Sequence, residues 1–300
     1  MLDINRVLKE DRLLRALTGL NRKAFDELLQ AFCVQLELEA IANTQKPRLR
    51  ALGGGRKARL LQASYKLFFI LFYFKCYPTF DVAGVLFDLH RSRAHHWMLR
   101  LQPLLESALG QKMALPERKL QSIEEFITRF PSAKEVMIDG TERPIQRPKD
   151  HQKQKNHYSG KKKCHTRKHL IMTDSDKRVL LLSKAREGKV HDKRQLDEEK
   201  LVDFVPDEVK IHVDLGFQGL QKEFVNIKIP TKKPKGKELT EEQKHLNREK
   251  SSDRVKCEHT ISGVKRYNAA RGLYRNHIKD LDDRFMFTAA GLWNFYLMAA

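Results

Sequence analysis

The sequence predicts a mixed α/β domain preceded by an all-α domain. Two observations predict this division. Near the start of the chain, apolar residues recur at helical spacing, as between Leu13 and Leu20. After residue 134, short strand patterns follow one another and then alternate with helical segments, which is typical of a mixed sheet. We therefore expect a helical domain over residues 1–110, a connector over 111–134 and an α/β domain over 135–300.

Composition indicates a globular chain with a polyanionic partner. Of the 300 residues, 41% are hydrophobic, which is enough for a core, and 58 Lys and Arg against 38 Asp and Glu give a formal charge of +20. Nucleic acid is the first candidate partner. The apolar run from Leu67 to Phe74 is far shorter than the roughly 20 residues of a membrane span. Because the N-terminus also lacks the pattern of a secretion signal, we expect a cytoplasmic protein without a membrane partner.

The helical domain contains the outline of a helix-turn-helix near residues 79–105. An apolar helix from Leu60 to Tyr77 is followed by Thr79, which we expect to cap a short helix, and then by Ser92, which we expect to cap the next. A basic start to the second helix favours entry into the major groove of DNA. The alternative is a plain helical bundle with a basic surface. The groove-facing candidates are Arg91, Ser92, Arg93, His95 and His96.

Two polar segments complete the first part of the chain. The loop Asn43–Lys57 combines Pro, Gly and basic residues, so we expect it to be exposed. The connector contains a short amphipathic pattern over 122–130, which predicts a helix.

The four cysteines show no C-x-x-C spacing, which indicates reduced thiols. One zinc site combining Cys164-His165 with Cys257-x-His259 is an alternative that the spacing does not require.

Strand patterns dominate the start of the α/β domain. EVMID and ERPIQRP predict two strands, and HLIMTD and VLLLSKAR predict two more. Asp192 and Gln195 have capping-box spacing, which predicts a helix running to about Phe204. KIHVD and NIKIP then predict two further short strands.

Three carboxylates occur in patterns that favour a metal site. Asp139 and Asp214 each end a strand-like run, where either residue taken alone is more simply a turn former. Glu258 lies on a predicted helix within a narrow arc shared with Arg254 and Lys265, and the alternative for that row is a solvated face with an ion pair. Together the three carboxylates suit two divalent metal ions.

The combination of these motifs resembles a known family. R-x3-E-x6-K at Arg254, Glu258 and Lys265, preceded by IDGTERPI and VDLGFQG, resembles the DDE transposases of bacterial insertion sequences, in particular the insertion-sequence-five-like group. Ser251 stands where the fuller pattern of that group has Tyr.

The resemblance implies a fold, cofactors and partners. The α/β domain is expected to be ribonuclease-H-like, with Asp139, Asp214 and Glu258 as catalytic residues and as ligands of two Mg²⁺ (or Mn²⁺) ions per active site. Similar transposases carry a helix-turn-helix before this domain, which favours DNA binding by the helical part. The expected partners are the double-stranded DNA of transposon ends and target, and a homodimer or higher homo-oligomer is expected on that DNA. A cytoplasmic transposase is then expected to be nucleoid-associated when bound to DNA.

The densest basic run, Arg147 to His169, lies between two predicted strands. Its segment YSGKKKCHTRKH resembles a recurrent stretch of the same transposases, so we assign it to phosphate contacts, with a solvated loop as the alternative. His191-Asp192 is expected to cap a helix, although similar proteins also have a His-Asp pair here. The candidate phosphate ligands, with the two cations that flank Glu258, are Lys161, Lys162, Lys163, Arg167, Lys168, Arg254 and Lys265.

Three hypotheses of function follow from these features. The first is a transposase that binds the ends of its element, cuts DNA and joins the new 3′-hydroxyl to target DNA. The second is an inactive, domesticated DNA-binding regulator, which the presence of all three carboxylates disfavours. The third is a metal-dependent DNA nuclease without joining activity, because hydrolysis and joining use the same metal site.

Overall fold

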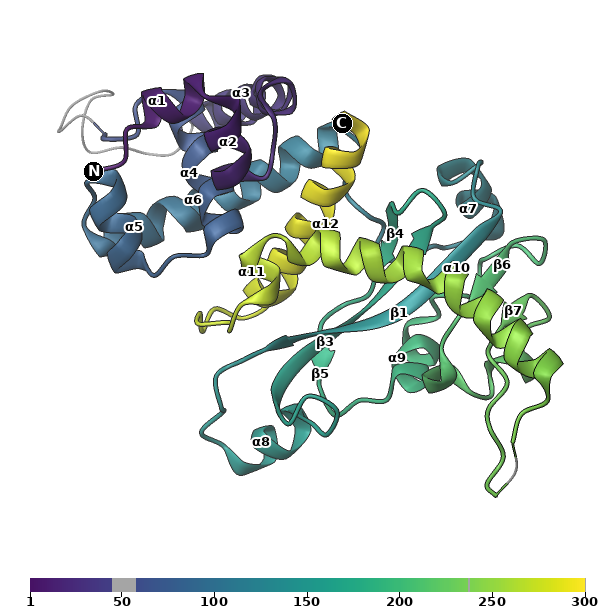
Figure 1. The fold of residues 1–300 in the computed structure, drawn as a ribbon. Coiled ribbons are helices and arrows are strands. Elements are labelled where there is room, and N and C mark those ends of the chain that lie inside the picture. The colour runs from purple at the N-terminus through teal and green to yellow at the C-terminus, as the bar shows by residue number, and fades with distance from the viewer. Residues whose placement is uncertain (45–57, 237, 300) are drawn as a thin grey trace. The chain divides into compact units, whose positions relative to one another are not determined.

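The computed structural model describes residues 1–44, 58–236 and 238–299 and divides the chain into two compact units. The first unit comprises Met1–Leu115, Arg266–Ala270 and Thr288–Ala300, and the second comprises Pro116–Lys265 and Arg271–Phe287. Figure 1 shows both units and labels most of their helices and strands. The expected exposed loop at Asn43–Lys57 lies, from residue 45 onward, outside the described residues.

The first unit is helical. Its core forms around α4, because every side chain of that helix from Leu67 to Phe74 is buried and the ring of Phe87 packs against Phe69 at 4.9 Å between centroids. The side chain of Asn21 accepts a hydrogen bond from the backbone N–H of Ala24 at 2.8 Å and so caps the start of α3 (Arg22–Thr44). The helices of this unit are α1 (Ile4–Lys9), α2 (Asp11–Thr18), α3 (Arg22–Thr44), α4 (Ala63–Cys76), α5 (Phe80–Phe87), α6 (Arg91–Gln111) and the end of α12 (Leu281–Ala299).

Helices α5 and α6 form the predicted pair, with one change at a cap. Thr79 caps α5 as expected, by accepting a hydrogen bond from Val82 N at 3.2 Å. The prediction that Ser92 caps α6 is wrong: the helix begins at Arg91, and its N-cap is His90. The cause is that the imidazole Nδ1 of His90 accepts from the backbone N–H of Ser92 and takes the role that a hydroxyl or carboxylate usually has.

The strands that the structure describes in the second unit form one seven-stranded mixed sheet, with the path β2-β3-β1-β6-β7. Strand β1 pairs antiparallel with β3 and parallel with β6, and β6 pairs parallel with β7. Strands β4 and β5 pair with β3. The strands are β1 (Glu135–Pro144), β2 (Tyr158–Ser159), β3 (Cys164–Asp174), β4 (Val179–Leu182), β5 (Arg186–Glu187), β6 (Lys210–His212) and β7 (Ile227–Lys228).

The two strands expected at EVMID and ERPIQRP are a single strand, so Asp139 lies within β1 and not at a strand end. The β1–β3 register runs without interruption from Val136 opposite Asp174 to Pro144 opposite Thr166. Continuous pairing with a long neighbour outweighs the turn preference of the dipeptide Asp139-Gly140.

The helices of the second unit include one long helix that crosses the sheet. Helix α10 (Glu241–Lys265) contains the predicted helical segment with Glu258, and it lies along β1, β3 and β6 (Figure 1). The helix predicted from Asp192 to about Phe204 is shorter in the structure, where α9 ends at Glu199. The remaining elements are α7 (Ile123–Arg129), α8 (His151–His157), α9 (Asp192–Glu199), η1 (Leu215–Phe217), η2 (Leu220–Lys222) and the start of α12. Helix α11 (Asn268–Arg271) is divided between the units, with Asn268–Ala270 in the first and Arg271 in the second.

The capping box predicted at the start of α9 is also wrong. His191 is the N-cap of this helix. The amide of Gln195 is buried and donates to Ser183 Oγ at 2.9 Å, so it is used in the core.

Alternation along the strands separates a core face from a helix face. Val136 and Ile138 on β1 belong to the core cluster that also includes Leu196 of α9 and Phe126 of α7. Because successive side chains of a strand point to opposite faces, Asp139 lies on the face opposite Ile138. Of the helices that the structure describes, none combines the length and apolar character that a bilayer crossing requires.

Candidate active site

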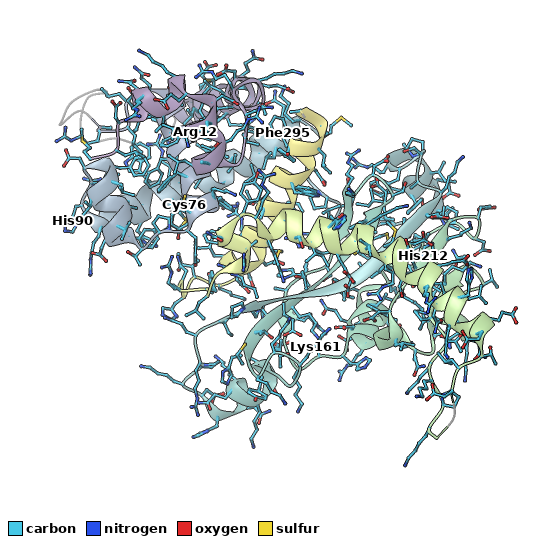
Figure 2. The ribbon with its side chains drawn as sticks, viewed as in Figure 1. Arg12, Cys76, His90, Lys161, His212 and Phe295 are labelled. Carbon is cyan, nitrogen blue, oxygen red and sulfur yellow. The ribbon has the colours of Figure 1, made fainter. Side chains whose placement is uncertain are left out.

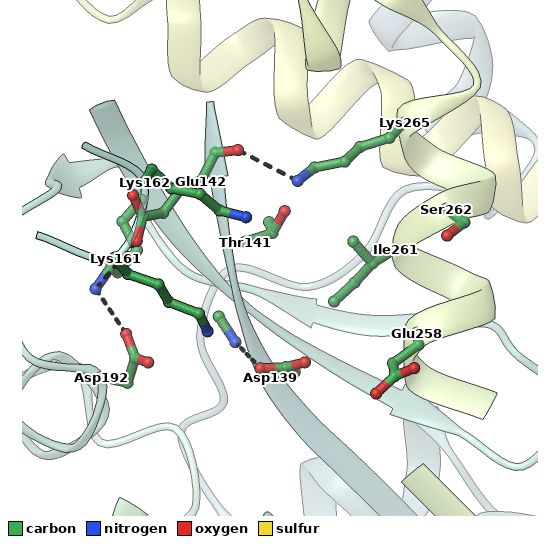
Figure 3. A pocket seen from close by; sticks show the side chains of 12 residues that line it. Asp139, Thr141, Glu142, Lys161, Lys162, Asp192, Glu258, Ile261, Ser262 and Lys265 are labelled. Atoms are coloured by element: carbon green, nitrogen blue, oxygen red, sulfur yellow. Dashed lines mark hydrogen bonds and ion pairs between the residues drawn. The ribbon is translucent and has the colours of Figure 1, made fainter. Parts of the chain in front are cut away.

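A polar pocket of about 290 Å³ opens between β1 and α10 in the second unit (Figure 3). Its lining combines carboxylates with lysines and contains little apolar surface. Two of the three predicted carboxylates line it: Asp139, which lies on β1, and Glu258, which lies on α10. The lining residues are Asp139, Gly140, Thr141, Glu142, Lys161, Lys162, Lys168, Asp192, Glu258, Ile261, Ser262 and Lys265.

Asp139 is a largely buried carboxylate beside a second one. Its Oδ1 accepts a hydrogen bond from the backbone N–H of Gly140 at 2.7 Å. Burial raises the pKa of Asp139, and the nearby charge of Asp214 raises it further, while Arg254 and Lys161 act in the opposite direction. An anionic carboxylate at this position is therefore stabilised by any added cation.

Asp214 follows β6, as predicted, and is close enough to Asp139 to influence its charge. Its side chain caps the short helix η1 by accepting from Gly216 N at 2.8 Å. The parallel pairing of β1 with β6 explains the proximity, because it brings the two strands side by side in the same direction. The turn-forming role that either aspartate has when considered alone is thus realised at Asp214.

Helix α10 presents Glu258 to the pocket and buries the adjoining stripe. The spacing of Cys257, Ile261 and Val264 predicts an apolar stripe that packs on the core; Cys257 and Val264 are 1% and 0% exposed, whereas Ile261 is half-buried and lines the pocket. Burial raises the pKa of the Cys257 thiol to about 12, with Asp139 adding to the effect, so this thiol is not a nucleophile at neutral pH. Arg254 directs its guanidinium towards Asp139, with Nη2 at 3.8 Å from Oδ2.

Three lysines form the basic rim of the pocket. Lys161 and Lys162 are exposed residues of the turn before β3, and Figure 3 shows both side chains at the pocket. Lys265 reaches back across it from the end of α10 and donates to the carbonyl oxygen of Glu142 at 3.2 Å. Burial lowers the pKa of Lys265, and the charge of Lys162 lowers it further. A polyanion entering the pocket would relieve this crowding of cations.

The other cations of the predicted basic run have different surroundings. Lys163 is exposed and adopts a left-handed backbone conformation at φ 56°. Arg167 pairs with Asp282 at 2.9 Å, and Lys168 is buried, so both side chains already have protein partners. The run itself is not one loop: it forms α8, β2 and the start of β3.

The helix-turn-helix candidates lie in the other unit. Arg91, Ser92, Arg93 and His96 are exposed at the start of α6. His95 is half-buried, because its ring packs edge-on against Phe80 of α5 at 4.8 Å. Figure 2 labels His90 where α6 begins and Lys161 in the second unit.

Two pocket carboxylates were not among the predicted site residues. Glu142 lies three positions after Asp139, and its Oε2 accepts from Thr166 Oγ1 at 2.7 Å. Asp192, which we expected only to cap a helix, forms an ion pair of 2.8 Å with Lys168. The signal for Asp192 was present in the His191-Asp192 pair, but only the fold brings α9 to β1.

The donors present suit a hard divalent cation. Carboxylate oxygens are the ligands that Mg²⁺ and Mn²⁺ prefer, and the lack of side chains at Gly140 and Gly216 lets the carboxylates of Asp192 and Asp214 lie close to the backbone there. Within the described residues, no group of three His, Cys, Asp or Glu side chains is arranged as a metal site. The alternative zinc site of Cys164-His165 with Cys257-x-His259 is therefore not formed among them. The four cysteines are free thiols.

A mixed sheet with a carboxylate pocket under basic residues defines a candidate phosphodiester-processing site, and comparisons agree with this class. Residues 138–294 match the DDE superfamily endonucleases, and residues 59–111 match the helix-turn-helix of DDE superfamily endonucleases. The chain is 31% identical over 245 residues to a probable transposase for insertion sequence element IS702 from Microchaete diplosiphon, covering 81% of this chain and 83% of that protein. No solved structure matches the chain significantly.

The chain belongs to the DDE superfamily of endonucleases, with a helix-turn-helix before its α/β domain. The resemblance to DDE transposases is thereby confirmed, and so is the predicted fold class of a helical DNA-binding-type domain followed by a ribonuclease-H-like mixed α/β domain. The roles of individual site residues stay predictions.

Proposed function

We propose that the protein is a transposase that cuts DNA at the ends of its element and joins the new 3′-hydroxyl to target DNA. The observation that carries this proposal is the pocket in which Asp139 and Glu258 face each other across β1 and α10, with Asp214 beside Asp139 and lysines at the rim. Cations at the rim suit the phosphates of DNA, and carboxylates at the centre suit Mg²⁺ or Mn²⁺.

Asp139, Asp214 and Glu258 are the residues that would hold two divalent ions. Members of this superfamily typically use divalent metal ions. When bound, such ions lower the pKa of an attacking water or 3′-hydroxyl and stabilise the leaving oxygen. The protein positions the carboxylates from two strands and one helix, while Arg254 holds Asp139 and Lys265 holds the backbone at Glu142.

Recognition of the element ends is assigned to α6. The exposed side chains at its start are Arg91, Ser92, Arg93 and His96, and His95 stands behind them against Phe80. In a helix-turn-helix, the residues at the start of the second helix contact base edges in the major groove. Lys161, Lys162 and Lys163 are assigned to phosphates near the cut bond, and Arg167, Lys168, Arg254 and Lys265 to shaping that surface. A homodimer or higher oligomer on double-stranded DNA would hold two ends together.

The test uses the full chain and the DNA that flanks its coding region. Short inverted repeats there define the substrate, and a duplex carrying them is incubated with the protein and Mg²⁺ beside a duplex with the repeats scrambled. We expect strand cuts at the repeat ends and joined products with a second DNA, both abolished by a chelator. Cutting without joined products would instead support the nuclease. Specific binding without any cutting would support the inactive regulator.

A further inference from the structure

Asp192 occupies a position between the two segments that carry the strand aspartates. A Cβ atom placed on Gly140 would lie 3.1 Å from Oδ1 of Asp192, and one placed on Gly216 would lie 3.6 Å from its Oδ2. Gly140 directly follows Asp139, and Gly216 comes two residues after Asp214. A single carboxylate therefore lies against the backbone of both segments, in space that any residue other than glycine would fill.

Lys168 contacts that carboxylate. Its side chain is 7% exposed, and Nζ lies 2.8 Å from Oδ1 of Asp192 and donates to the carbonyl oxygen of Val190 at 2.7 Å. Lys168 is in turn held on β3, directly opposite Glu142 of β1, whose Oε1 is 3.8 Å away. Figure 3 shows Asp192 on the side of the pocket away from Glu258, with a dashed line that marks its ion pair.

An ion pair is an unfavourable means of attaching a helix to a sheet, because both charges lose contact with water. Removing two ions from water costs several kcal/mol, and an apolar pair of similar size usually packs as well or better. The start of α9 already has an apolar contact nearby, because Leu196 is part of the core cluster. An ion pair between the buried Lys168 and the partly buried Asp192 at this place therefore points to a task that depends on exact placement of a carboxylate.

We propose that Lys168 and Asp192 are positioning residues that set the spacing between Asp139 and Asp214. This inference rests on the proposed function, since that spacing matters only where both aspartates hold the same divalent ions. Mg²⁺ needs oxygen ligands in nearly ideal geometry at about 2.1 Å, so a small change in the gap between β1 and the segment after β6 weakens its binding. Partners that orient ligands in this way are typically worth about 10- to 100-fold in metal affinity.

The test measures metal binding without DNA. Mn²⁺ is titrated into the full-length protein, free Mn²⁺ is followed by its electron paramagnetic resonance signal, and thermal unfolding is recorded in parallel. Asp192→Asn and Lys168→Met should each raise the half-saturating Mn²⁺ concentration by about tenfold or more. The double variant should be no worse than the weaker-binding single variant, because the two residues act as one pair.

A matched control lies on the same helix. Asp197 of α9 forms an ion pair with Lys193 at 2.8 Å but does not line the pocket, so Asp197→Asn should bind Mn²⁺ like the parent. Asp192→Glu keeps the charge and adds a methylene where Gly140 and Gly216 leave space for an aspartate. It should therefore fail to restore the affinity.

Each other result overturns the inference. Asp192→Asn and Lys168→Met could bind Mn²⁺ like the parent while Asp139→Asn does not, which leaves the proposed function intact and removes the positioning role. Full affinity in Asp192→Glu would show that charge alone matters. Loss of cooperative unfolding in both variants would make the pair an anchor of the fold. If Asp139→Asn also binds Mn²⁺ normally, the proposed function itself fails.

Discussion

Arg254 on α10 directs its guanidinium at Asp139 on β1, with Nη2 3.8 Å from Oδ2. Glu258 lies one helical turn further along α10. Arg254 therefore lies beside the predicted ligand Asp139, while the same helix presents the predicted ligand Glu258 to the pocket. The arginine also opposes the rise that burial and Asp214 cause in the pKa of Asp139. Two members of this row, Glu258 and Lys265, line the pocket, and the third, Arg254, lies beside Asp139.

Neutralising any one of the three predicted ligands should abolish cutting. Asp139→Asn, Asp214→Asn and Glu258→Gln keep size but remove a charge that a divalent ion needs in its coordination shell. DNA binding should remain, or tighten as repulsion with phosphate falls. The measurement is Mg²⁺-dependent cleavage alongside a binding titration.

The control for that series is Asp176→Asn, an exposed carboxylate in the turn between β3 and β4. It should cut DNA like the parent. Glu142 is unsuitable as a control because it lines the pocket. Normal cutting and joining by Glu258→Gln would remove α10 from the chemistry.

Removing Arg93 should weaken specific binding more than binding to random DNA. Arg93 is exposed at the start of α6, and the loss of one base contact costs about 1 to 3 kcal/mol. Binding isotherms on repeat-containing and scrambled duplexes measure the difference. Arg12→Ala changes an exposed arginine of α2 in the same unit and should leave the difference unchanged. Equal losses on both duplexes would make Arg93 a phosphate contact.

Exposed lysines at the pocket rim should contribute to the salt dependence of binding. Log affinity for duplex DNA falls by about 0.9 per phosphate neutralised for each unit of log salt concentration. Replacing both Lys161 and Lys162 with Gln should therefore reduce the slope by about 2. Lys9→Gln with Lys23→Gln removes the same charge from the helical unit. An unchanged slope in the rim variant would place the lysines away from DNA.

Asp283 should make the second unit sensitive to acid. Its carboxylate pairs with Arg118 at 2.7 Å and with His169 at 3.1 Å. Burial acts to raise the pKa of Asp283, but the hydrogen bond of His169 and the charge of Arg118 outweigh it, so the pKa is lowered overall. Burial lowers the pKa of His169.

Both groups thus have folded-state pKa values below the unfolded ones. The stability that they contribute is complete above the unfolded values and is lost as pH falls, from about 6.5 for His and about 3.9 for Asp. Chemical denaturation at a series of pH values should show this loss. Asp283→Asn should cost about 3 kcal/mol at neutral pH and flatten the acidic limb, whereas Asp176→Asn should do neither. A parent whose stability is constant down to pH 3 would contradict the assignment.

The sequence alone determined the class of protein and most of its local structure. Helical periodicity located α2 and α4, and the cap Thr79 of α5 followed from its hydrogen-bonding group. The spacing of Arg254, Glu258 and Lys265 placed all three on one helix, as α10 shows. These inferences succeed because they depend on neighbours within a few residues, where periodicity and capping chemistry operate.

Only the tertiary structure decided which side chains share the pocket. Because it pairs with β3, the segment around Asp139-Gly140 forms one continuous strand. Parallel pairing of that strand with β6 brings Asp214 beside Asp139. The same packing buried Lys168 and brought Asp192 to Gly140 from a helix distant in sequence. Sequence spacing carries no such information, because contacts between remote segments depend on sheet order and on space that glycine leaves open.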